Sequence, residues 1–419
     1  MANTLPQMTF VQETMTSLAG HVRVGIESSN ASIPGDDQFH ANSGATLELP
    51  PLDSYGVDSR WFDVFSTGID TCNWTATTES WVQLSESSGT VGPKGNDSRV
   101  WVSIDWENAP SAPNSSVVAI NISTPCRKFD RFAYREPQVL LSVNVRSIPD
   151  NFTEGFVESD GTISIEGPHY QSIAEPSNSK GNSSSDKITY HTFKNYGRTY
   201  AGVGLWPMDL DKVELDDAPA LQYEMYLFSN DTLANVTLFL GPTQNYLSDL
   251  NPLEYAIALY PANDSTPSKP ERVHFVGDSE GANMPPQWGS AVSDAAWGVH
   301  SNTTTTGFNI TDEGAYTLKI WCLFPSIIVQ KIVIDLGGVR PSYLGPPESF
   351  LVGRDEIGKY NMSSFLDSPD TLGGVTLRSK GASGTGGSDD DDEDAAMILA
   401  GPSGWMLTLV VATALVLII

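Results

Sequence analysis

Alternation of apolar and other side chains is clearest over two segments, residues 316–323 and residues 328–335. In each segment every second residue is apolar, with Gln330 the only polar member, which is the period expected of a β-strand with one buried face. A Phe324-Pro325-Ser326 sequence separates the two, and the Gly337-Gly338 pair that follows the second permits positive φ angles. The pattern predicts a hairpin at the centre of a β-sandwich.

Shorter extended runs, separated by clusters of Gly, Pro, Ser and Asn, recur along the rest of the chain. This spacing predicts an all-β fold of two antiparallel β-sandwiches, an immunoglobulin-like one over residues 20–150 and a jelly-roll-like one over residues 155–349. The expected strands of the first are residues 22–26, 61–65, 73–76, 81–84, 100–106 and 117–122, with one or two more in 131–146. Those of the second also include residues 163–165, 221–227, 236–240, 255–260 and 272–276.

The chain is strongly acidic, with a formal net charge of −28 and a pI near 4.3. Nucleic-acid binding requires a basic surface, so we expect no nucleic-acid partner. Acidity suits a secreted protein that works beside neutral or acidic polysaccharide. Solubility through self-repulsion explains the charge equally well.

Of the 22 asparagines, 13 begin an N-x-[ST] sequon, whereas chance gives roughly four. This excess predicts passage through the secretory route and N-glycosylation. The acceptors are Asn30, Asn73, Asn96, Asn114, Asn121, Asn151, Asn182, Asn230, Asn235, Asn263, Asn302, Asn309 and Asn361.

Three cysteines allow at most one intramolecular disulfide. Cys72 and Cys126 lie in the same expected sandwich and are the candidate pair. Cys322 falls on the apolar face of its strand, where a small buried side chain is expected.

The two ends of the chain differ in character. Residues 1–19 hold one short expected helix, from Phe10 to Ala19, as a remnant or linker, and no secretory signal is evident. Residues 350–394 form a stalk rich in Gly, Ser and Asp, and residues 395–419 end in an uninterrupted apolar run. This layout favours a GPI-attachment signal over a single membrane segment, with candidate attachment sites at Ser383, Gly384 and Asp394. An anchor signal without an entry signal suggests the back part of a longer protein.

Several spaced motifs resemble the C-terminal domain of glycoside hydrolase family 115. They include residues 318–321, 330–335 and 341–349, preceded in the family's order by Ile165-Glu166, His169-Tyr170, residues 195–199, Leu221, Tyr223 and residues 241–243. The family comprises the xylan α-1,2-glucuronidases, which remove (4-O-methyl)glucuronic acid branches from xylan. The resemblance covers residues 20–349, with the first sandwich similar to the small one that precedes the last domain.

The resemblance implies a non-catalytic part of a secreted glucuronidase, because the family's catalytic acids belong to an upstream barrel. No catalytic residue is therefore carried onto this sequence, and this chain alone is expected to be inactive. Its implied partner is plant cell-wall glucuronoxylan, and its implied role is polysaccharide binding or assembly of the parent enzyme. The alternative is a stand-alone carbohydrate-binding glycoprotein, anchored at the cell surface.

One structural calcium ion is the only cofactor suggested. In carbohydrate modules that the second sandwich resembles, a Glu in the first strand and an Asp in the last bind calcium, and Glu166 and Asp335 occupy those places. Calcium needs six to eight oxygen ligands. The family's usual Glu-Ala-Glu reads Glu166-Gly167-Pro168 here, so one expected carboxylate is missing.

Contacts with sugar or with another domain are expected from conspicuous loop residues. These are Tyr196, Arg198, Trp206, Tyr343 and Glu348.

Two other patterns carry no chemistry. The acidic residues at 209, 211, 214, 216 and 217 indicate a solvated loop. The G-x-S-x-G match at residues 277–281 lacks the helix that a serine nucleophile requires, because Pro285-Pro286 follows closely.

Overall fold

A computed structural model gives the fold of most of the chain. It describes residues 22–29, 32–33, 46–66, 68, 70–93, 97–110, 116–126, 136–178, 188–199, 201–247, 251–264, 269–279, 284–340, 342 and 344–353. The expected helix at residues 10–19, residues 354–394 of the expected stalk, the apolar tail and the candidate attachment residues Ser383, Gly384 and Asp394 lie outside these ranges. The first residues of the expected stalk belong to the second sandwich instead, because Leu351–Val352 form a strand that pairs within it. Within them, no helix is long and apolar enough to cross a bilayer.

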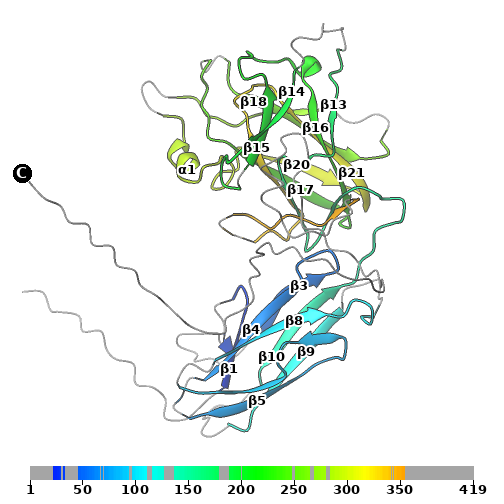
Figure 1. Ribbon diagram of the computed structural model, residues 1–419, viewed down its shortest axis with the longest axis vertical. Coiled ribbons are helices and arrows are strands. Elements are labelled where there is room, and N and C mark those ends of the chain that lie inside the picture. The colour runs from blue at the N-terminus through cyan, green and yellow to red at the C-terminus, as the bar shows by residue number, and fades with distance from the viewer. Residues whose placement is uncertain are drawn as a thin grey trace, which may run out of the picture. The chain divides into compact units, whose positions relative to one another are not determined.

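The described residues of the first sandwich form two five-stranded sheets (Figure 1). One sheet has the order β2 (Ser32–Ile33), β1 (Val22–Ile26), β4 (Ser59–Ser66), β8 (Ser98–Ile104) and β6 (Val82–Leu84). The other has the order β3 (Leu47–Asp53), β10 (Gln138–Asn144), β9 (Ser116–Ser123), β5 (Cys72–Thr77) and β7 (Ser88–Val91). Buried residues alternate with more accessible ones in β4 of the first sheet and in β5 of the second, and residues of both sheets share one core, so each sheet turns one face to it.

The second sandwich is built from a seven-stranded and a six-stranded sheet. The seven-stranded sheet has the order β19 (Glu271–His274), β18 (Glu254–Pro261), β21 (Gly314–Cys322), β16 (Ala220–Leu227), β11 (Gly155–Val157) and β23 (Leu351–Val352), with β13 (Ser172–Ala174) also pairing with β16. The six-stranded sheet has the order β14 (Thr189–Lys194), β15 (Ala201–Trp206), β22 (Val329–Asp335), β17 (Thr232–Leu240) and β20 (Thr305–Ile310), with β12 (Thr162–Glu166) also pairing with β22.

The prediction of an all-β fold is confirmed, and the described helices are short. They are a 3-10 turn, η1 (Leu215–Asp217), and one α-helix of six residues, α1 (Trp288–Ser293). Strand pairing is antiparallel except between β3 and β10 and between β11 and β16, which are parallel. These two parallel pairs are the exceptions to the expected antiparallel arrangement among the described strands.

The expected central hairpin is a connection between sheets instead. β21 pairs with β16 and β18, whereas β22 pairs with β12, β15 and β17, so the two strands belong to opposite sheets. The connecting residues Leu323, Phe324 and Ile327 are fully buried. Burial of these side chains favours a path through the core over a solvent-exposed turn, because their apolar surface is removed from water.

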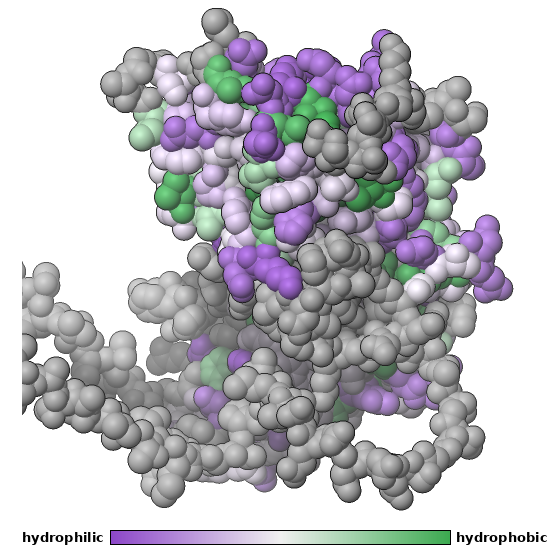
Figure 2. Space-filling view, turned by 45° about the horizontal axis from the view of Figure 1, so that its top comes forward, coloured by the Kyte–Doolittle hydropathy of each residue, from purple (hydrophilic) through white to green (hydrophobic). Residues whose placement is uncertain are grey.

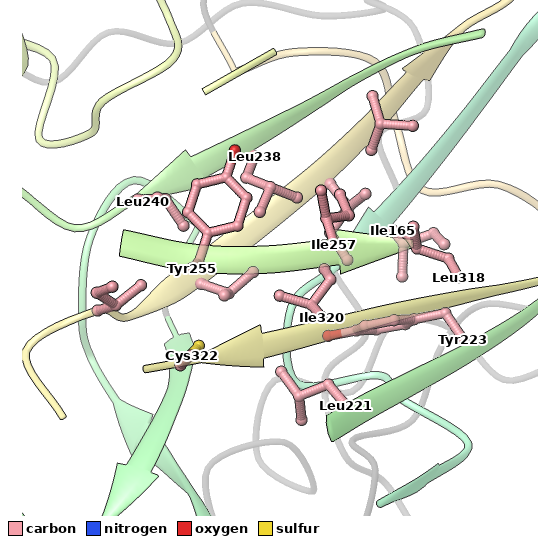
Figure 3. Close-up of a cluster of buried hydrophobic side chains, with 14 of the residues drawn as sticks. Ile165, Leu221, Tyr223, Leu238, Leu240, Tyr255, Ile257, Leu318, Ile320 and Cys322 are labelled. Carbon is pink, nitrogen blue, oxygen red and sulfur yellow. The ribbon is translucent and has the colours of Figure 1, made fainter. Parts of the chain in front are cut away.

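The core of the second sandwich is formed by inward-facing residues from both sheets. Figure 3 shows Leu221, Ile257 and Ile320 from one sheet near Ile165 and Leu238 from the other. Cys322 is part of the same cluster, and burial raises the pKa of its thiol to about 12. This thiol is therefore protonated at neutral pH and packs as a small apolar group.

The two sandwiches belong to one compact unit, and charged side chains join them. The Arg60 guanidinium contacts Glu27 of the first sandwich at 3.1 Å and Asp160 of the second at 2.6 Å. Arg146 lies 3.4 Å from Asp53 and 3.6 Å from Glu158, and both carboxylates are fully buried. Buried carboxylates require such partners, so these contacts fix the junction.

Candidate functional site

A row of aromatic side chains lies on the outer face of the β14–β15 strand pair. Tyr190 and Thr192 of β14 are buried, so the alternate residues His191 and Phe193 face away from the core. The His191 ring centroid lies 5.2 Å from that of Phe193 and 5.2 Å from that of Trp206. Tyr196 extends the row, with its ring centroid 6.4 Å from that of Phe193. These four side chains are called the aromatic row below.

Two glycines of β15 make room for the row. Gly204 pairs with His191 and Gly202 with Phe193, so β15 itself places no side chain beside these two rings, and the Ile328 side chain lies over both glycines. A Cβ on Gly202 would lie 3.2 Å from Tyr196 Cδ1 and 2.5 Å from Ile328 Cγ2. Both contacts are closer than is usual in protein interiors, so the Ile328 and Tyr196 side chains already fill the space over Gly202.

Trp206 is the most accessible member of the row. It is 45% exposed, whereas the other three are half-buried. The planes of His191 and Trp206 are inclined by 42°, so the row presents tilted rings instead of one flat plane. An exposed indole beside other rings can pack against the C–H groups of a sugar ring.

The coloured part of the surface in Figure 2 is mostly hydrophilic. On the face drawn in Figure 2, the coloured hydrophobic residues form small separate groups among hydrophilic ones. Among the coloured residues of that view, no broad apolar face is seen.

Arg198 serves the interior of the domain. Its side chain is 3% exposed, and its Nη1 donates a hydrogen bond of 2.6 Å to the Asp294 carbonyl oxygen. Its backbone N–H donates to Gln330 Oε1 at 2.7 Å, and Gln330 Nε2 donates to the Ala295 carbonyl oxygen at 2.8 Å. The expected sugar or domain contact at Arg198 is therefore wrong, because these contacts bind the loop 195–199 to β22 and to the end of α1. Tyr196 is half-buried in the same loop, and burial raises its pKa.

Glu348 also faces inward. Its Oε1 accepts a hydrogen bond of 2.9 Å from the Glu166 backbone N–H and lies 2.6 Å from His169 Nδ1. Ser349 pairs with Ser164 through two bonds, of 2.8 Å from its backbone N–H and 2.9 Å to its hydroxyl. The prediction that the segment up to Ser349 packs against a sandwich is confirmed for its described residues. Tyr343 lies outside them.

The calcium hypothesis is wrong in its geometry. Glu166 pairs with Lys331 across the β12–β22 ladder, whereas Asp335 pairs with Thr162 at the other end. Four residues of extended chain span roughly 13 Å, which is too far for two ligands of one ion. The Glu166 carboxylate accepts a 2.9 Å hydrogen bond from the Lys331 ammonium, and Asp335 Oδ1 accepts from the N–H of Gly337. Across the described residues, no group of three or more metal-ligating side chains forms.

The acidic loop is solvated, as expected. Asp209, Asp211, Glu214, Asp216 and Asp217 are all exposed. No apolar pocket surrounds them to hold one carboxyl protonated, which glycoside hydrolysis requires.

The described part of the G-x-S-x-G match, residues 277–279, follows β19, and α1 begins only at Trp288. This serine therefore lacks the strand-turn-helix setting of a nucleophile.

Covalent features are placed as follows. Cys72 and Cys126 form a disulfide with their Cα atoms 5.8 Å apart, and Cys322 is free and buried.

Eight sequon asparagines are described, of which Asn235 is half-buried and the others are exposed. Glycosylation itself stays a prediction. The exposed acceptors are Asn73, Asn121, Asn151, Asn230, Asn263, Asn302 and Asn309.

Sequence reasoning did not identify His191 and Phe193 as site residues, although the alternating pattern that places them on one face of a strand was present. Residues 189–194 alternate between inward and outward side chains over a single short strand, which follows the sequon at Asn182. Gly202 and Gly204 weakened the pattern of the partner strand, since glycine lowers strand propensity. Without that partner, the two rings could not be placed beside Trp206.

Comparison with protein families gives one match. Residues 155–348 match the model of the glycosyl hydrolase family 115 C-terminal domain. These 194 of 419 residues correspond to the second sandwich and leave the first sandwich uncovered. No curated protein matches the chain in sequence.

Solved structures with some similarity have low scores. The 4-O-methyl-α-glucuronidase BtGH115A, described as specific for decorated arabinogalactans, is 11% identical with a TM-score of 0.28, over 46% of this chain and 19% of that enzyme. A two-domain protein of unknown function from Bacteroides fragilis NCTC 9343 is 9% identical with a TM-score of 0.25, over 76% and 95% of the two chains. The Clostridium thermocellum xylanase 10B CBM22-1-GH10 modules, complexed with xylohexaose, are 10% identical with a TM-score of 0.21, over 45% and 28%. These scores are too low to support an inference about function.

Proposed function

We propose, from the premise that residues 155–348 are a glycosyl hydrolase family 115 C-terminal domain, that this chain is an accessory part of a glucuronidase system and binds its polysaccharide without cleaving it. The ligand would be a glucuronic acid-bearing xylan, which is the substrate class of the family that the sequence resembles. Binding would take place on the aromatic row.

The exposure of Trp206 beside His191 is the observation that carries this proposal. Covering an exposed indole with the apolar face of a sugar ring would remove its apolar surface from water, which favours binding. Here the centroid of the indole lies 5.2 Å from that of the His191 ring, at the exposed end of β15. Together they offer a stacking surface without a deep pocket, which suits a long polymer bound along its length.

The remaining conspicuous residues of the second sandwich support an accessory role. Arg198 and Glu348 are engaged inside the domain. Neither is available to act as an acid or base on a sugar. The acidic loop that could supply carboxylates is open to water, without the apolar setting that would keep a catalytic acid protonated.

The test is the affinity of the full chain for glucuronoxylan, measured by isothermal titration calorimetry. Trp206→Ala should weaken binding about tenfold, which corresponds to about 1.4 kcal/mol, because the main stacking ring is lost. The matched control is Trp101→Ala, since Trp101 is 44% exposed on β8 of the first sandwich. Equal affinities for the two variants would show that the aromatic row does not bind the polysaccharide.

A further inference from the structure

Sequon asparagines are concentrated at one edge of the six-stranded sheet. Half of the eight that the structure describes lie on β17, on β20 or in the turns beside these strands, namely Asn230, Asn235, Asn302 and Asn309. β17 and β20 are neighbours, and among the described strands β20 pairs with β17 alone (Figure 1). β20 is therefore an edge strand, and its outer row of backbone N–H and C=O groups faces no other described strand.

Edge strands invite pairing with another chain, so proteins usually guard them with charged side chains, prolines or very short strands. Most strands at the ends of the four sheets have such a guard. β19 contains Glu271 and Arg272, β14 ends at Lys194, β3 contains Pro50-Pro51, and β2, β6 and β23 are only two or three residues long. β20 has the sequence TTGFNI, with neither a charge nor a proline over its six residues.

β7 is the other described sheet end without a charge or a proline, and it too lies beside a sequon. Its four residues read SGTV. Asn73 of β5 lies directly opposite Thr90 of β7, and the Thr90 hydroxyl donates a hydrogen bond of 2.8 Å to Asn73 Oδ1. Both unguarded edges therefore have a glycan acceptor on the strand itself or directly across from it. A sugar chain is bulky and hydrophilic, so it can block an edge as a charge does.

The acceptors at β20 lie on the outer face of the sheet. Asn309 pairs with Leu233 of β17, and Asn235 pairs with Gly307 of β20. Leu233 is 51% exposed, so this face carries an uncovered apolar side chain between the two acceptors. A Cβ on Gly307 would lie 3.3 Å from Leu233 Cδ1 and 3.6 Å from Asn235 Oδ1. Glycine therefore keeps open the space beside the half-buried Asn235 amide.

We propose that N-linked glycans on Asn235 and Asn309 prevent the β20 edge of this chain from pairing with the β20 edge of a second copy. The proposal goes beyond the predicted glycosylation, on which it rests, and it is independent of polysaccharide binding at the aromatic row. In that modification the asparagine nitrogen bonds to the anomeric carbon of a lipid-linked oligosaccharide. The bond from that carbon to the pyrophosphate carrier breaks, and the nitrogen loses one proton.

A second copy is the partner that fits this edge. Each chain has a net charge of −28, so two copies repel one another at most contacts. An uncharged strand adds nothing to this repulsion. An antiparallel pair of β20 strands about a two-fold axis presents the same strand on both sides, as closed dimers require.

The experiment compares the mass of glycosylation variants of the full chain. Each is produced behind an added secretory signal in a host that attaches N-linked glycans, and its protein mass is measured by light scattering in one nonionic detergent. The natural chain should carry sugar on Asn235 and Asn309, as read by glycopeptide mass spectrometry. Asn235→Gln with Asn309→Gln should about double the protein mass. Asn151→Gln removes an exposed acceptor in a turn and should leave the mass unchanged.

A lysine at position 309 separates edge pairing from misfolding. Asn235→Gln with Asn309→Lys also lacks both sugars, but it places a charge on the edge strand, so it should keep the mass of the natural chain. Three results would overturn the proposal. They are the absence of sugar from either asparagine, an unchanged mass of the double glutamine variant, and equal association of the lysine and glutamine variants.

Discussion

At the scale of single residues, Asp53 has the most informative environment. It is fully buried at the end of β3, where its Oδ1 accepts a hydrogen bond from the Tyr55 N–H at 3.1 Å. Burial raises its pKa from 3.8 to about 6, although the charge of Arg146 acts in the opposite direction. Burial outweighs the ion pair because Arg146 approaches only to 3.4 Å.

This raised pKa predicts how stability depends on pH. Between pH 4 and pH 6 the folded chain holds a proton on Asp53 that the unfolded chain has released, so this residue lowers the free energy of unfolding as the pH rises. Over the whole window the loss is about 3 kcal/mol at most. Asp53→Asn cannot titrate and keeps an oxygen for the Tyr55 N–H. The free energy of unfolding of the variant, minus that of the natural chain, should therefore increase from pH 4 to pH 6.

Urea denaturation at pH 4, 5, 6, 7 and 8 measures this difference. The difference in the free energy of unfolding between the variant and the natural chain should level off above pH 7, where Asp53 is ionised in both the folded and the unfolded state. A difference that is flat from pH 4 to pH 6, or that falls, would contradict the assignment.

Sequence could place single residues in loops and strands but could not supply their partners. Arg198 and Glu348 looked like contact residues because each stands in a loop between apolar strands. Their actual partners, Asp294 and Glu166, are 96 and 182 positions away. Periodicity is a local property, so it carries no information about such contacts.

At the scale of elements, strongly alternating strands were predictable and irregular ones were not. β1 and β21 follow the expected pattern closely. β3 contains Pro50-Pro51, which argues against a strand, yet it pairs only with β10 at the edge of its sheet. Proline is tolerated there because one side of an edge strand needs no hydrogen-bond donors.

The position of β21 and β22 in opposite sheets could not be read from alternation either. Both a hairpin and a connection between sheets bury one face of each strand. The choice depends on the linker, whose Leu323 and Phe324 are buried. Sequence shows that these residues are apolar but not which sheets they join.

The glycines of β15 yield a prediction for this element. Gly202→Ala should lower the free energy of unfolding by about 1–3 kcal/mol, because the new methyl meets Ile328 Cγ2 at 2.5 Å and Tyr196 Cδ1 at 3.2 Å. The same displacement should weaken glucuronoxylan binding by disturbing the aromatic row.

Gly289→Ala is the matched control for this substitution. It lies in α1 with no atom within 4 Å of the added Cβ, so it should be neutral or stabilising by about 0.5–1 kcal/mol. Chemical denaturation measures both variants. Equal stability for the two would show that β15 has space for side chains.

At the scale of the whole molecule, the sequence suggests an extracellular protein attached to a surface. The 13 sequons and the apolar run after residue 395 are the basis of this proposal. With an added secretory signal, the full chain should reach the cell surface and be released by a phosphatidylinositol-specific phospholipase, because a GPI anchor replaces the apolar tail. Retention after this treatment, judged by surface immunostaining, would favour a membrane segment.

Whether the chain binds polysaccharide without cleaving it is tested most directly in one incubation of the purified full chain with glucuronoxylan. Retention of the chain on the insoluble polysaccharide and release of uronic acid into solution are measured on the same sample. We expect retention and no released uronic acid, because the described carboxylates of the second sandwich are either engaged internally or open to water. Release of uronic acid by this chain alone, or failure to be retained, would contradict the proposed function.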